Sequence, residues 1–342
     1  MKVGIAGFAL AGKSTVFHWL TSVKPDPGKA QHGQLGMAKI PDERLDWLSA
    51  HFKPKKTTFA TLEFLDTPGL MTGERKDNPR RLAILRDSDG LLIVLNGYGD
   101  GDVAAELVQF REELLFADLE VVTNRIDRLK DQLKKAKPAK EKEADQHEMT
   151  LLQRLQEGFE QNLPAVAMGL KPEEEKAVRS FQLLTLKPQF ALVNCSEALV
   201  GKPLPAKLKE LAPEAIAAPA KLEMELEELS EEDRKTFKDE LGLGDSSRGD
   251  VLRNIYYAMN MLVFFTIGED ECRAWTIAKG DDAVTGAGKI HTDLAKSFVR
   301  AEVVAYDDFK KVGSLKEAKT HGVYRLEGKT YEVKDGDIMH IL

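Results

Sequence analysis

Apolar residues in the N-terminal two thirds of the chain gather in short unbroken runs. The runs at 2–7, 62–65, 91–95 and 189–193 have the length of strands and are bounded by turn residues or charges. Parallel strands that are buried on both faces have this pattern. Helix-like segments lie between the runs, at 14–21, 42–51 and 78–87. Strands that alternate with helices predict an α/β core with a mostly parallel sheet.

Residues 102–179 follow a different pattern, with almost no strand signal. Apolar residues recur there three and four positions apart in two stripes, which are Leu119, Val122, Ile126, Leu129 and Leu133, then Met149, Leu152, Leu155, Phe159 and Leu163. Such stripes predict two antiparallel helices that pack as a short coiled coil. The lysine-rich stretch 134–145 carries Pro138 between them, so we expect it to form the tip of the hairpin.

The C-terminal part begins with helices and then becomes rich in strands. We expect an acidic helix at 223–241 that ends at Gly242 and Gly244, and a further helix at 249–262. From residue 263 onward the pattern predicts strands at 273–277, 298–305, 324–326 and 331–333. Turns are expected at Gly280, Gly328 and Gly336. The last unit is therefore predicted to be a small β-rich domain.

Composition narrows the class of protein. A length of 342 residues suggests two or three domains. With 42% hydrophobic and 31% charged residues, the chain is globular rather than disordered. Two cysteines fit a reducing compartment, no run approaches a membrane span, and the N-terminus leaves no room for a signal peptide, so we expect a cytoplasmic protein. The net charge of −7 argues against bulk affinity for nucleic acid, although a local basic patch remains compatible with it.

Residues 7–14 read Gly-Phe-Ala-Leu-Ala-Gly-Lys-Ser and match the phosphate-loop pattern G-x-x-x-x-G-K-[ST] between a predicted strand and a predicted helix. Backbone N–H groups of such a loop and the start of the helix bind phosphate oxygens. Lys13 would bridge the β- and γ-phosphates, and the Ser14 hydroxyl would bind Mg²⁺. A chance glycine-rich turn is the weaker alternative. The predicted phosphate-binding residues are Gly7, Ala9, Leu10, Ala11, Gly12, Lys13, Ser14 and Thr15.

The sequence Asp66-Thr67-Pro68-Gly69 follows another apolar run. Asp66 can hold Mg²⁺, usually through water, and the Gly69 N–H can contact a γ-phosphate. We therefore predict Lys13 and Gly69 as catalytic residues and Ser14 and Asp66 as metal ligands, although the same tetrapeptide also occurs in ordinary turns. Many GTPases carry a water-orienting glutamine at the next position, where this chain has Leu70. Another group must position the water, or hydrolysis is slow.

The run 189–193 is followed by Asn194-Cys195-Ser196-Glu197, where GTPases carry Asn-Lys-x-Asp. Asn194 could pair with the N6/N7 edge of adenine. A glutamate in place of aspartate is poorly placed for guanine. We predict that Asn194, Cys195 and Glu197 form the base site, with ATP favoured over GTP. The alternatives are that Asn194 only caps a turn and that Cys195 is a buried structural residue rather than a redox-sensitive one.

With these motifs, the chain resembles the YchF/Obg-like ATPase family of P-loop NTPases. Further segments carry the resemblance over nearly the whole chain, at 41–46, 53–56, 183–188, 273–277, 288–293, 298–303, 305–308 and 335–340. The resemblance implies a G domain (1–103 and 180–262), an inserted helical domain (104–179) and a C-terminal β-grasp TGS domain (263–342). It also implies hydrolysis of ATP, or of GTP, with Mg²⁺, and association with the ribosome.

Three departures from the family pattern indicate a divergent member. The loop 24–35 is short and lacks the switch threonine, with Lys29, Ala30 and Gln31 near its place. Ala9-Leu10-Ala11 stands where the family usually has Pro-Asn followed by Val or Ala, and 96–103 lacks the histidine of some members. Three hypotheses remain open. The chain is a slow ATPase, a nucleotide-gated ribosome or RNA adaptor with negligible turnover, or an Obg-type GTPase that prefers GTP.

Lysines cluster at the predicted hairpin tip, at Lys130, Lys134, Lys135, Lys137, Lys140 and Lys142. They could contact rRNA phosphates in a salt-dependent manner. The alternative is a solvated helix end. We expect the ribosome or its RNA to be contacted through this tip and the TGS domain, we expect no membrane partner, and the sequence leaves the oligomeric state open.

Overall fold

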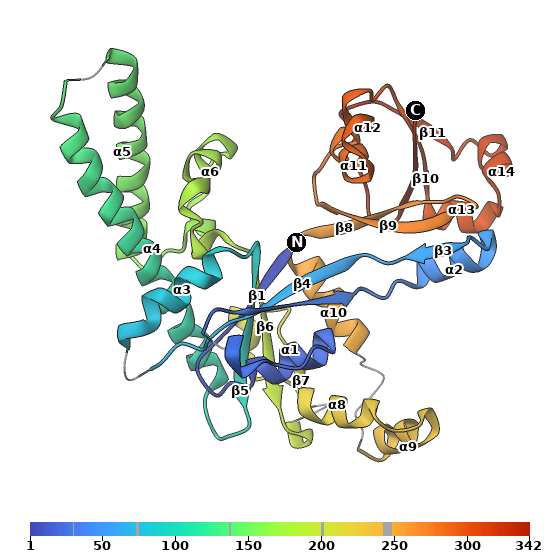
Figure 1. The fold of residues 1–342 in the computed structure, drawn as a ribbon, viewed down its shortest axis with the longest axis horizontal. Helices are drawn as coiled ribbons and strands as arrows, with labels where there is room; N and C mark the ends of the chain where they lie inside the picture. The colour runs from blue at the N-terminus through green and yellow to red at the C-terminus, as the bar shows by residue number, and fades with distance from the viewer. Residues whose placement is uncertain (30, 73–74, 137, 200–201, 242–247) are drawn as a thin grey trace. The chain divides into compact units, whose positions relative to one another are not determined.

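The computed structural model describes residues 1–342 apart from 30, 73–74, 137, 200–201 and 242–247. The chain divides into two compact units (Figure 1). The first consists of Met1–Gly36 and Phe64–Asp245, and the second of Met37–Glu63 and Ser246–Leu342.

A six-stranded sheet in the order β2-β4-β1-β5-β6-β7 forms the centre of the first unit. The pairs β1–β5, β5–β6 and β6–β7 are parallel, which agrees with the predicted α/β core. The short strand β7 and the edge strand β2, in which only alternate residues are buried, were not predicted. The strands are β1 Lys2–Ala6, β2 Gln34–Lys39, β4 Thr61–Asp66, β5 Gly90–Gly97, β6 Gln189–Cys195 and β7 Ile216–Ala218.

Helices of the first unit pack on this sheet or extend from it. The α-helices are α1 Lys13–Thr21, α3 Asn78–Arg86, α4 Val103–Leu133, α5 Ala139–Glu160, α6 Pro172–Val178, α7 Ala206–Leu211, α8 Ala220–Glu227 and α9 Glu231–Leu241. Short 3₁₀ helices are η1 Pro27–Lys29, η2 Arg75–Asp77, η3 Ala165–Met168, η4 Arg179–Phe181, η5 Leu184–Leu186 and η6 Glu197–Leu199.

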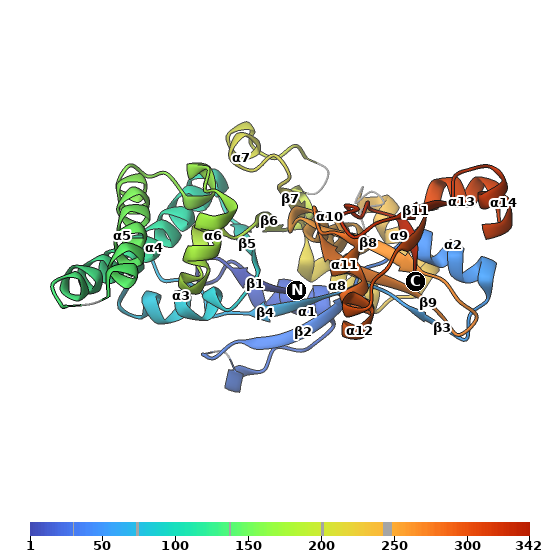
Figure 2. The same cartoon turned by 90° about the horizontal axis from the view of Figure 1, so that it is seen from above.

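The predicted hairpin is confirmed as α4 and α5, which lie side by side in both views (Figures 1 and 2). Helix α4 begins well before the predicted stripe, because Asp102 accepts hydrogen bonds from the N–H groups of Ala104 and Ala105. Its first half packs in the core of the sheet, through residues such as Leu107 and Phe110. Its second half packs against α5 in a separate core, which includes Val122, Ile126, Leu129, Leu152, Leu155 and Phe159.

The hairpin tip is less basic than its lysine count suggests. Lys130 and Lys134 form ion pairs of 3.1 and 2.9 Å with Asp127 and Asp131 of the same helix. Pro138 directly precedes α5, as predicted for the tip. Lys137 lies outside the described residues. The charges available to a partner are therefore reduced on the α4 side.

The single acidic helix predicted for 223–241 is wrong, because α8 and α9 are separate helices. The Ser230 hydroxyl accepts a hydrogen bond of 3.2 Å from the Asp233 N–H, so Ser230 caps the start of α9. A serine that caps a helix start competes with continuation of the preceding helix. The predicted end at Gly242 and Gly244 lies outside the described residues.

A second six-stranded sheet, in the order β11-β10-β12-β8-β9-β3, forms the centre of the second unit. Helix α11 packs on it in a core that includes Phe264, Ala287, Val303 and Met339, which is the predicted β-grasp arrangement. The strands are β3 Lys56–Thr58, β8 Met261–Thr266, β9 Glu271–Ala278, β10 Ala301–Ala305, β11 Arg325–Glu327 and β12 Asp337–Ile341. The helices are α2 Glu43–Phe52, α10 Arg248–Ala258, α11 Ala283–Ile290, α12 Thr292–Lys296, α13 Tyr306–Val312 and α14 Leu315–Thr320.

Two predictions within this unit need correction. Helix α10 ends at Ala258 rather than at residue 262, because Asn260 has a left-handed backbone (φ +56°) and Met261 already enters β8. Residues 331–333 form only an isolated bridge, between Glu332 and Asp282. Strands β8 and β12 were not predicted.

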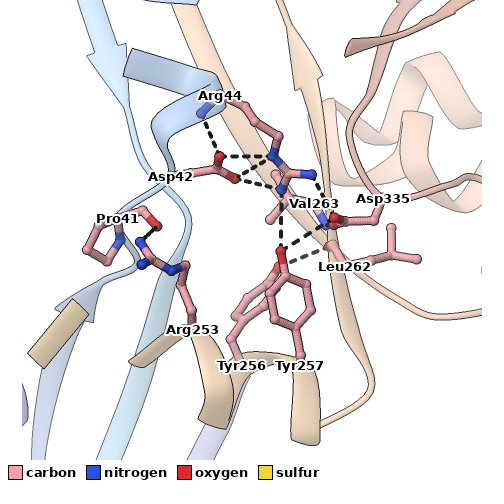
Figure 3. Close-up of polar contacts among 9 residues, drawn as sticks. All are labelled: Pro41, Asp42, Arg44, Arg253, Tyr256, Tyr257, Leu262, Val263 and Asp335. Atoms are coloured by element: carbon pink, nitrogen blue, oxygen red, sulfur yellow. Dashed lines mark hydrogen bonds and ion pairs between the residues drawn. The ribbon is translucent and has the colours of Figure 1, made fainter. Parts of the chain in front are cut away.

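The second unit includes residues 37–63, which we predicted within the G domain and which contain the ends of β2 (37–39) and β4 (61–63). Strand β3 pairs in parallel with β9, with Lys56 opposite Glu271. Arg44 bridges Asp42 and Asp335 at 2.7 Å each, and Asp335 also accepts a bond from the Val263 N–H (Figure 3). Two stretches that we predicted within the G domain, 37–63 and 246–262, therefore fall in the second compact unit. The three-domain scheme stays a prediction.

Candidate nucleotide-binding site

The phosphate loop connects the end of β1 to the start of α1, as the sequence predicts. Two of its glycines have backbones that other residues rarely adopt, Gly7 at φ +142° and Gly12 at φ +85°. A Cβ on Gly7 would lie 2.4 Å from the Val94 carbonyl oxygen, and one on Gly12 would lie 2.0 Å from Asn194 Nδ2. Gly12 is also the N-cap of α1, with no side-chain cap and no acidic residue in the first turn. The N–H groups at this helix start can therefore bind an anion.

A cavity of about 430 Å³ opens between the phosphate loop and the end of β4. It brings together most of the predicted phosphate and metal residues, namely Ala9, Leu10, Gly12, Lys13, Ser14, Thr15, Asp66 and Gly69. Gly7 and Ala11, the other two predicted phosphate-binding residues, belong to the same loop but do not line the cavity. The cavity is also lined by five residues that were not predicted as part of the site, namely Pro25, Asp26, Pro27, Lys29 and Gln34. The sequence marked this loop, 24–35, as the first-switch loop but assigned these five residues no role in the site.

Lys13 is buried at the base of this cavity, with 6% of its surface exposed. Its ammonium donates a hydrogen bond of 2.7 Å to the Phe8 carbonyl oxygen. Burial lowers the pKa of Lys13 to about 8, against the opposing effect of the Asp66 carboxylate. A phosphate at this position would restore the preference for the charged form.

Asp66 has the environment of a cation ligand. Burial raises the pKa of its carboxyl group, while a hydrogen bond from the Ser14 hydroxyl and the Lys13 charge oppose the rise. Its Oδ1 atom is buried and has no hydrogen-bond partner among the described residues. A buried polar atom without a partner is costly. A carboxylate oxygen beside a hydroxyl is a donor set that suits a hard divalent cation, so these residues fit Mg²⁺.

Backbone hydrogen bonds hold the Asp66–Gly69 loop against the phosphate loop. The Ala9 N–H donates to the Leu70 carbonyl oxygen at 2.8 Å, and the Leu70 N–H donates to the Gly7 carbonyl oxygen at 3.1 Å. Gly69 lies so close that a Cβ there would be 2.4 Å from Lys13 Nζ. Lys13 and Gly69, the two residues predicted to be catalytic, are therefore neighbours.

The side chain that follows this loop points away from the cavity. Leu70 is 1% exposed and packs in the hydrophobic core with Phe8 and Phe110. Sequence reasoning missed Arg81 of α3, whose guanidinium donates a hydrogen bond to the Gly69 carbonyl oxygen. The signal for this contact was weak, because an arginine pair at 80–81 is unremarkable in a helix.

Of the predicted base-site residues, Asn194 contacts the phosphate loop directly. It is 2% exposed, and its Nδ2 donates a hydrogen bond of 3.1 Å to the Ala11 carbonyl oxygen, while its Oδ1 has no partner among the described residues. Glu197 is exposed at the start of η6. Tyr98 also lies near this loop, since burial, Cys195 and Glu197 raise the pKa of its phenol group. Recognition of the base by these residues stays a prediction.

Cys195 is fully buried in the hydrophobic core beneath the strand ends. Burial raises the pKa of its thiol to about 11. A thiol of this kind is not a reactive thiolate at neutral pH. The structural interpretation of Cys195 is therefore favoured over the redox one, and its side chain does not line the cavity.

The sheet order, the phosphate loop and the adjoining Asp66–Gly69 loop define a P-loop NTPase. Residues 2–143 match the family model MMR_HSR1, described as "50S ribosome-binding GTPase", and residues 261–342 match YchF-GTPase_C, described as "Protein of unknown function (DUF933)". The chain belongs to the YchF family, as the resemblance predicted.

Relatives cover the chain from end to end. The chain is 34% identical to "Ribosome-binding ATPase YchF" of Bacillus subtilis, over 99% of this chain and 98% of that protein. It is 34% identical to the protein of the same name from Haemophilus influenzae, with the same coverage. The solved structure of the Schizosaccharomyces pombe YchF GTPase matches with a TM-score of 0.83 and 27% identity, over 100% of this chain and 97% of that one. Among the described helices, none combines the length and apolar character that crossing a membrane requires.

Proposed function

We propose that the chain hydrolyses ATP with Mg²⁺ and associates with the ribosome. The observation that carries the proposal is the cavity where three features meet. These are the N–H groups at the start of α1, the buried ammonium of Lys13, and Asp66 Oδ1, which has no hydrogen-bond partner among the described residues. These groups match the needs of a triphosphate and its cation. The printed names of the bacterial relatives support ATP as substrate and the ribosome as partner.

The residues divide the work of hydrolysis between them. The phosphate-loop backbone holds the β- and γ-phosphates, and Lys13 exchanges the Phe8 carbonyl for a phosphate oxygen. Ser14 and Asp66 would hold Mg²⁺, which neutralises charge on the phosphates when bound. The Gly69 N–H contacts the γ-phosphate, so its loop distinguishes ATP from ADP. Positioning and electrostatic stabilisation then favour in-line attack by water.

Preference for ATP rests on Asn194 and Glu197 in place of the guanine-reading pattern. Calorimetric titration with non-hydrolysable ATP and GTP analogues tests this preference, with Lys13→Ala as the variant that should lose both. Tighter binding of the ATP analogue is expected. A clear preference for the GTP analogue would overturn the assignment and favour the Obg-type alternative.

The alternative function is a nucleotide-gated ribosome or RNA adaptor with negligible turnover. Two observations support it, since Leu70 is buried where a water-orienting glutamine would lie and the first-switch loop lacks a threonine. Hydrolysis measured on purified chain separates the two functions. If Lys13→Ala abolishes ribosome association while the wild-type chain hydrolyses ATP only at the background rate, the adaptor function is correct. Multiple turnovers of ATP by the wild-type chain favour the enzyme.

For the ribosome contact, we propose the exposed lysines of the hairpin tip together with the C-terminal β-grasp domain. A ribosomal partner also supports the predicted cytoplasmic location. Charge reversal at the tip should weaken co-sedimentation with ribosomes and reduce its salt dependence. The tip variant replaces Lys135, Lys140 and Lys142 by glutamate. The matched control variant also introduces three glutamates, in place of the exposed Lys202, Lys207 and Lys221. Equal co-sedimentation of the two variants would contradict a role for the tip.

A further inference from the structure

The sequence has neither the glutamine after the Asp66–Gly69 loop nor the threonine in loop 24–35 that commonly assist NTP hydrolysis. Leu70 is buried, and the short first-switch loop has no threonine. Lys13 already serves the β- and γ-phosphates. A second positive charge near the γ-phosphate would compensate for the missing groups, since such a charge is worth ~10³–10⁵ in rate in other P-loop enzymes.

Arg81 lies beside Gly69, the residue proposed to contact the γ-phosphate. Its guanidinium donates a hydrogen bond to the carbonyl oxygen of Gly69, and a Cβ added to Gly69 would lie 2.4 Å from Lys13 Nζ. Both cations therefore lie beside the same glycine. Pro68 lines both the main cavity and a smaller one of about 100 Å³ that Arg81 borders. The positive charge of Arg81 also contributes to the lowered pKa of Lys13, after burial.

Helix α3 holds Arg81 in a fixed position. Asn78 in its first turn is 2% exposed and bonds both the N–H and the carbonyl oxygen of Met71, at 3.0 Å each. Leu82 and Leu85 of the same helix are buried in the core. A side chain mounted on a rigid element is positioned more accurately than one on a free loop.

We propose that the Arg81 guanidinium contacts the γ-phosphoryl group of bound ATP and stabilises its charge during hydrolysis, as an arginine finger supplied by the chain itself. The proposal rests on the ATPase function proposed above. Water attacks the γ-phosphorus, the bond to the β–γ bridging oxygen breaks, and ADP leaves with the bond's electron pair. The proton of the attacking water passes to the released phosphate or to solvent. A guanidinium has five N–H donors in a planar fork, so it can keep the Gly69 carbonyl and still bind an oxygen of the phosphoryl group.

The test compares Arg81→Ala and Arg81→Lys with Arg80→Ala, which removes the exposed arginine beside it. Single-turnover hydrolysis is measured at saturating ATP and Mg²⁺ on the full chain, together with the affinities for ADP and for ADP with aluminium fluoride. We expect Arg81→Ala to slow hydrolysis ~10²-fold or more and to lose the gain in affinity that aluminium fluoride gives. Its affinity for ADP should stay within about threefold, and Arg80→Ala should match the wild type.

Two further results separate a catalytic role from a structural one. Added guanidinium ion should partly restore hydrolysis to Arg81→Ala, and Arg81→Lys should retain an intermediate rate because it keeps the charge without the planar fork. Arg81→Ala with a rate within about threefold of the wild type would overturn the proposal. If Arg81→Ala lost its affinity for ADP and added guanidinium ion did not restore hydrolysis, the proposal would also be overturned, in favour of a structural role for Arg81. A wild-type chain that hydrolyses no ATP would overturn the ATPase function itself, and this proposal with it.

Discussion

The replacement of Gly69 by alanine tests how tightly the two loops of the site must pack. A Cβ at this position would lie 2.4 Å from Lys13 Nζ, 2.7 Å from Ala9 N and 2.8 Å from Ala9 Cα. The Lys13 ammonium is the end of a flexible chain and can move at low cost. The Ala9 backbone cannot, because its N–H is bonded to the Leu70 carbonyl oxygen at 2.8 Å. The methyl group must therefore push the two loops apart.

Overpacking of this kind costs about 1–3 kcal/mol. The cost falls on the loops that we propose to hold the γ-phosphate. The affinity for ATP should therefore drop about 5–150-fold, since each 1.4 kcal/mol corresponds to about a factor of ten. The affinity for ADP should fall less, because the γ-phosphate is the only group that we propose Gly69 to contact. Calorimetric titration with ADP and with a non-hydrolysable ATP analogue measures both effects.

Gly99→Ala is the matched control, because a Cβ at Gly99 would meet no atom within 4 Å. It should leave both affinities unchanged. If Gly69→Ala bound the ATP analogue within about twofold of the wild type, the loops would be freer to separate than the geometry indicates, and the reasoning would be refuted. An equal loss for ADP and ATP would show that the γ-phosphate is not what Gly69 contacts.

Three further predictions concern stability and pH. The pKa of Lys13 is about 8 in the folded chain and 10.5 ordinarily, so the unfolded chain binds more protons between these two pH values. The free energy of unfolding should therefore rise from pH 8 to pH 10.5, while the affinity for ATP falls. Urea unfolding and calorimetric titration across this range measure both changes, and Lys13→Met should lose the pH dependence. Asp118→Ala should lower the free energy of unfolding in urea by about 3–5 kcal/mol, because it leaves Arg86, which pairs with Asp118 at 2.7 Å, without its buried partner. The control is Asp127→Ala, which removes an exposed ion pair and should cause no measurable change. Leu10→Asn should raise the free energy of unfolding by up to about 1 kcal/mol, since Leu10 has φ +68° and is 93% exposed; a loss of stability would contradict this.

Local sequence was sufficient for the parts of the site that lie on one strand–loop–helix unit. The phosphate loop requires glycines at positions 7 and 12, a strand before it and a helix after it, and all are adjacent in the chain. The helical hairpin could also be predicted from the sequence, because the spacing of three and four between its apolar residues is a local pattern. Even the break at Ser230 had a local signal, a serine three residues before Asp233, that the helix prediction passed over.

Other features depend on contacts between residues that are far apart in the sequence, and only the tertiary structure decided them. Strand β3 is too short to be recognised alone, and it forms because β9 supplies hydrogen-bond partners more than two hundred positions away. Arg81 carries no motif, and its position beside Gly69 follows from the packing of α3 against the core.

Burial decided the roles of Cys195 and Leu70 in the same way. Sequence placed both beside the nucleotide, but the core that surrounds them turns their side chains away from the cavity. The amino-acid sequence by itself determined the class of protein and the phosphate-loop fold, because neighbouring residues form them. Tertiary structure decided which side chains complete the site, because the free energy of packing acts between distant segments and leaves no periodic pattern in either of them.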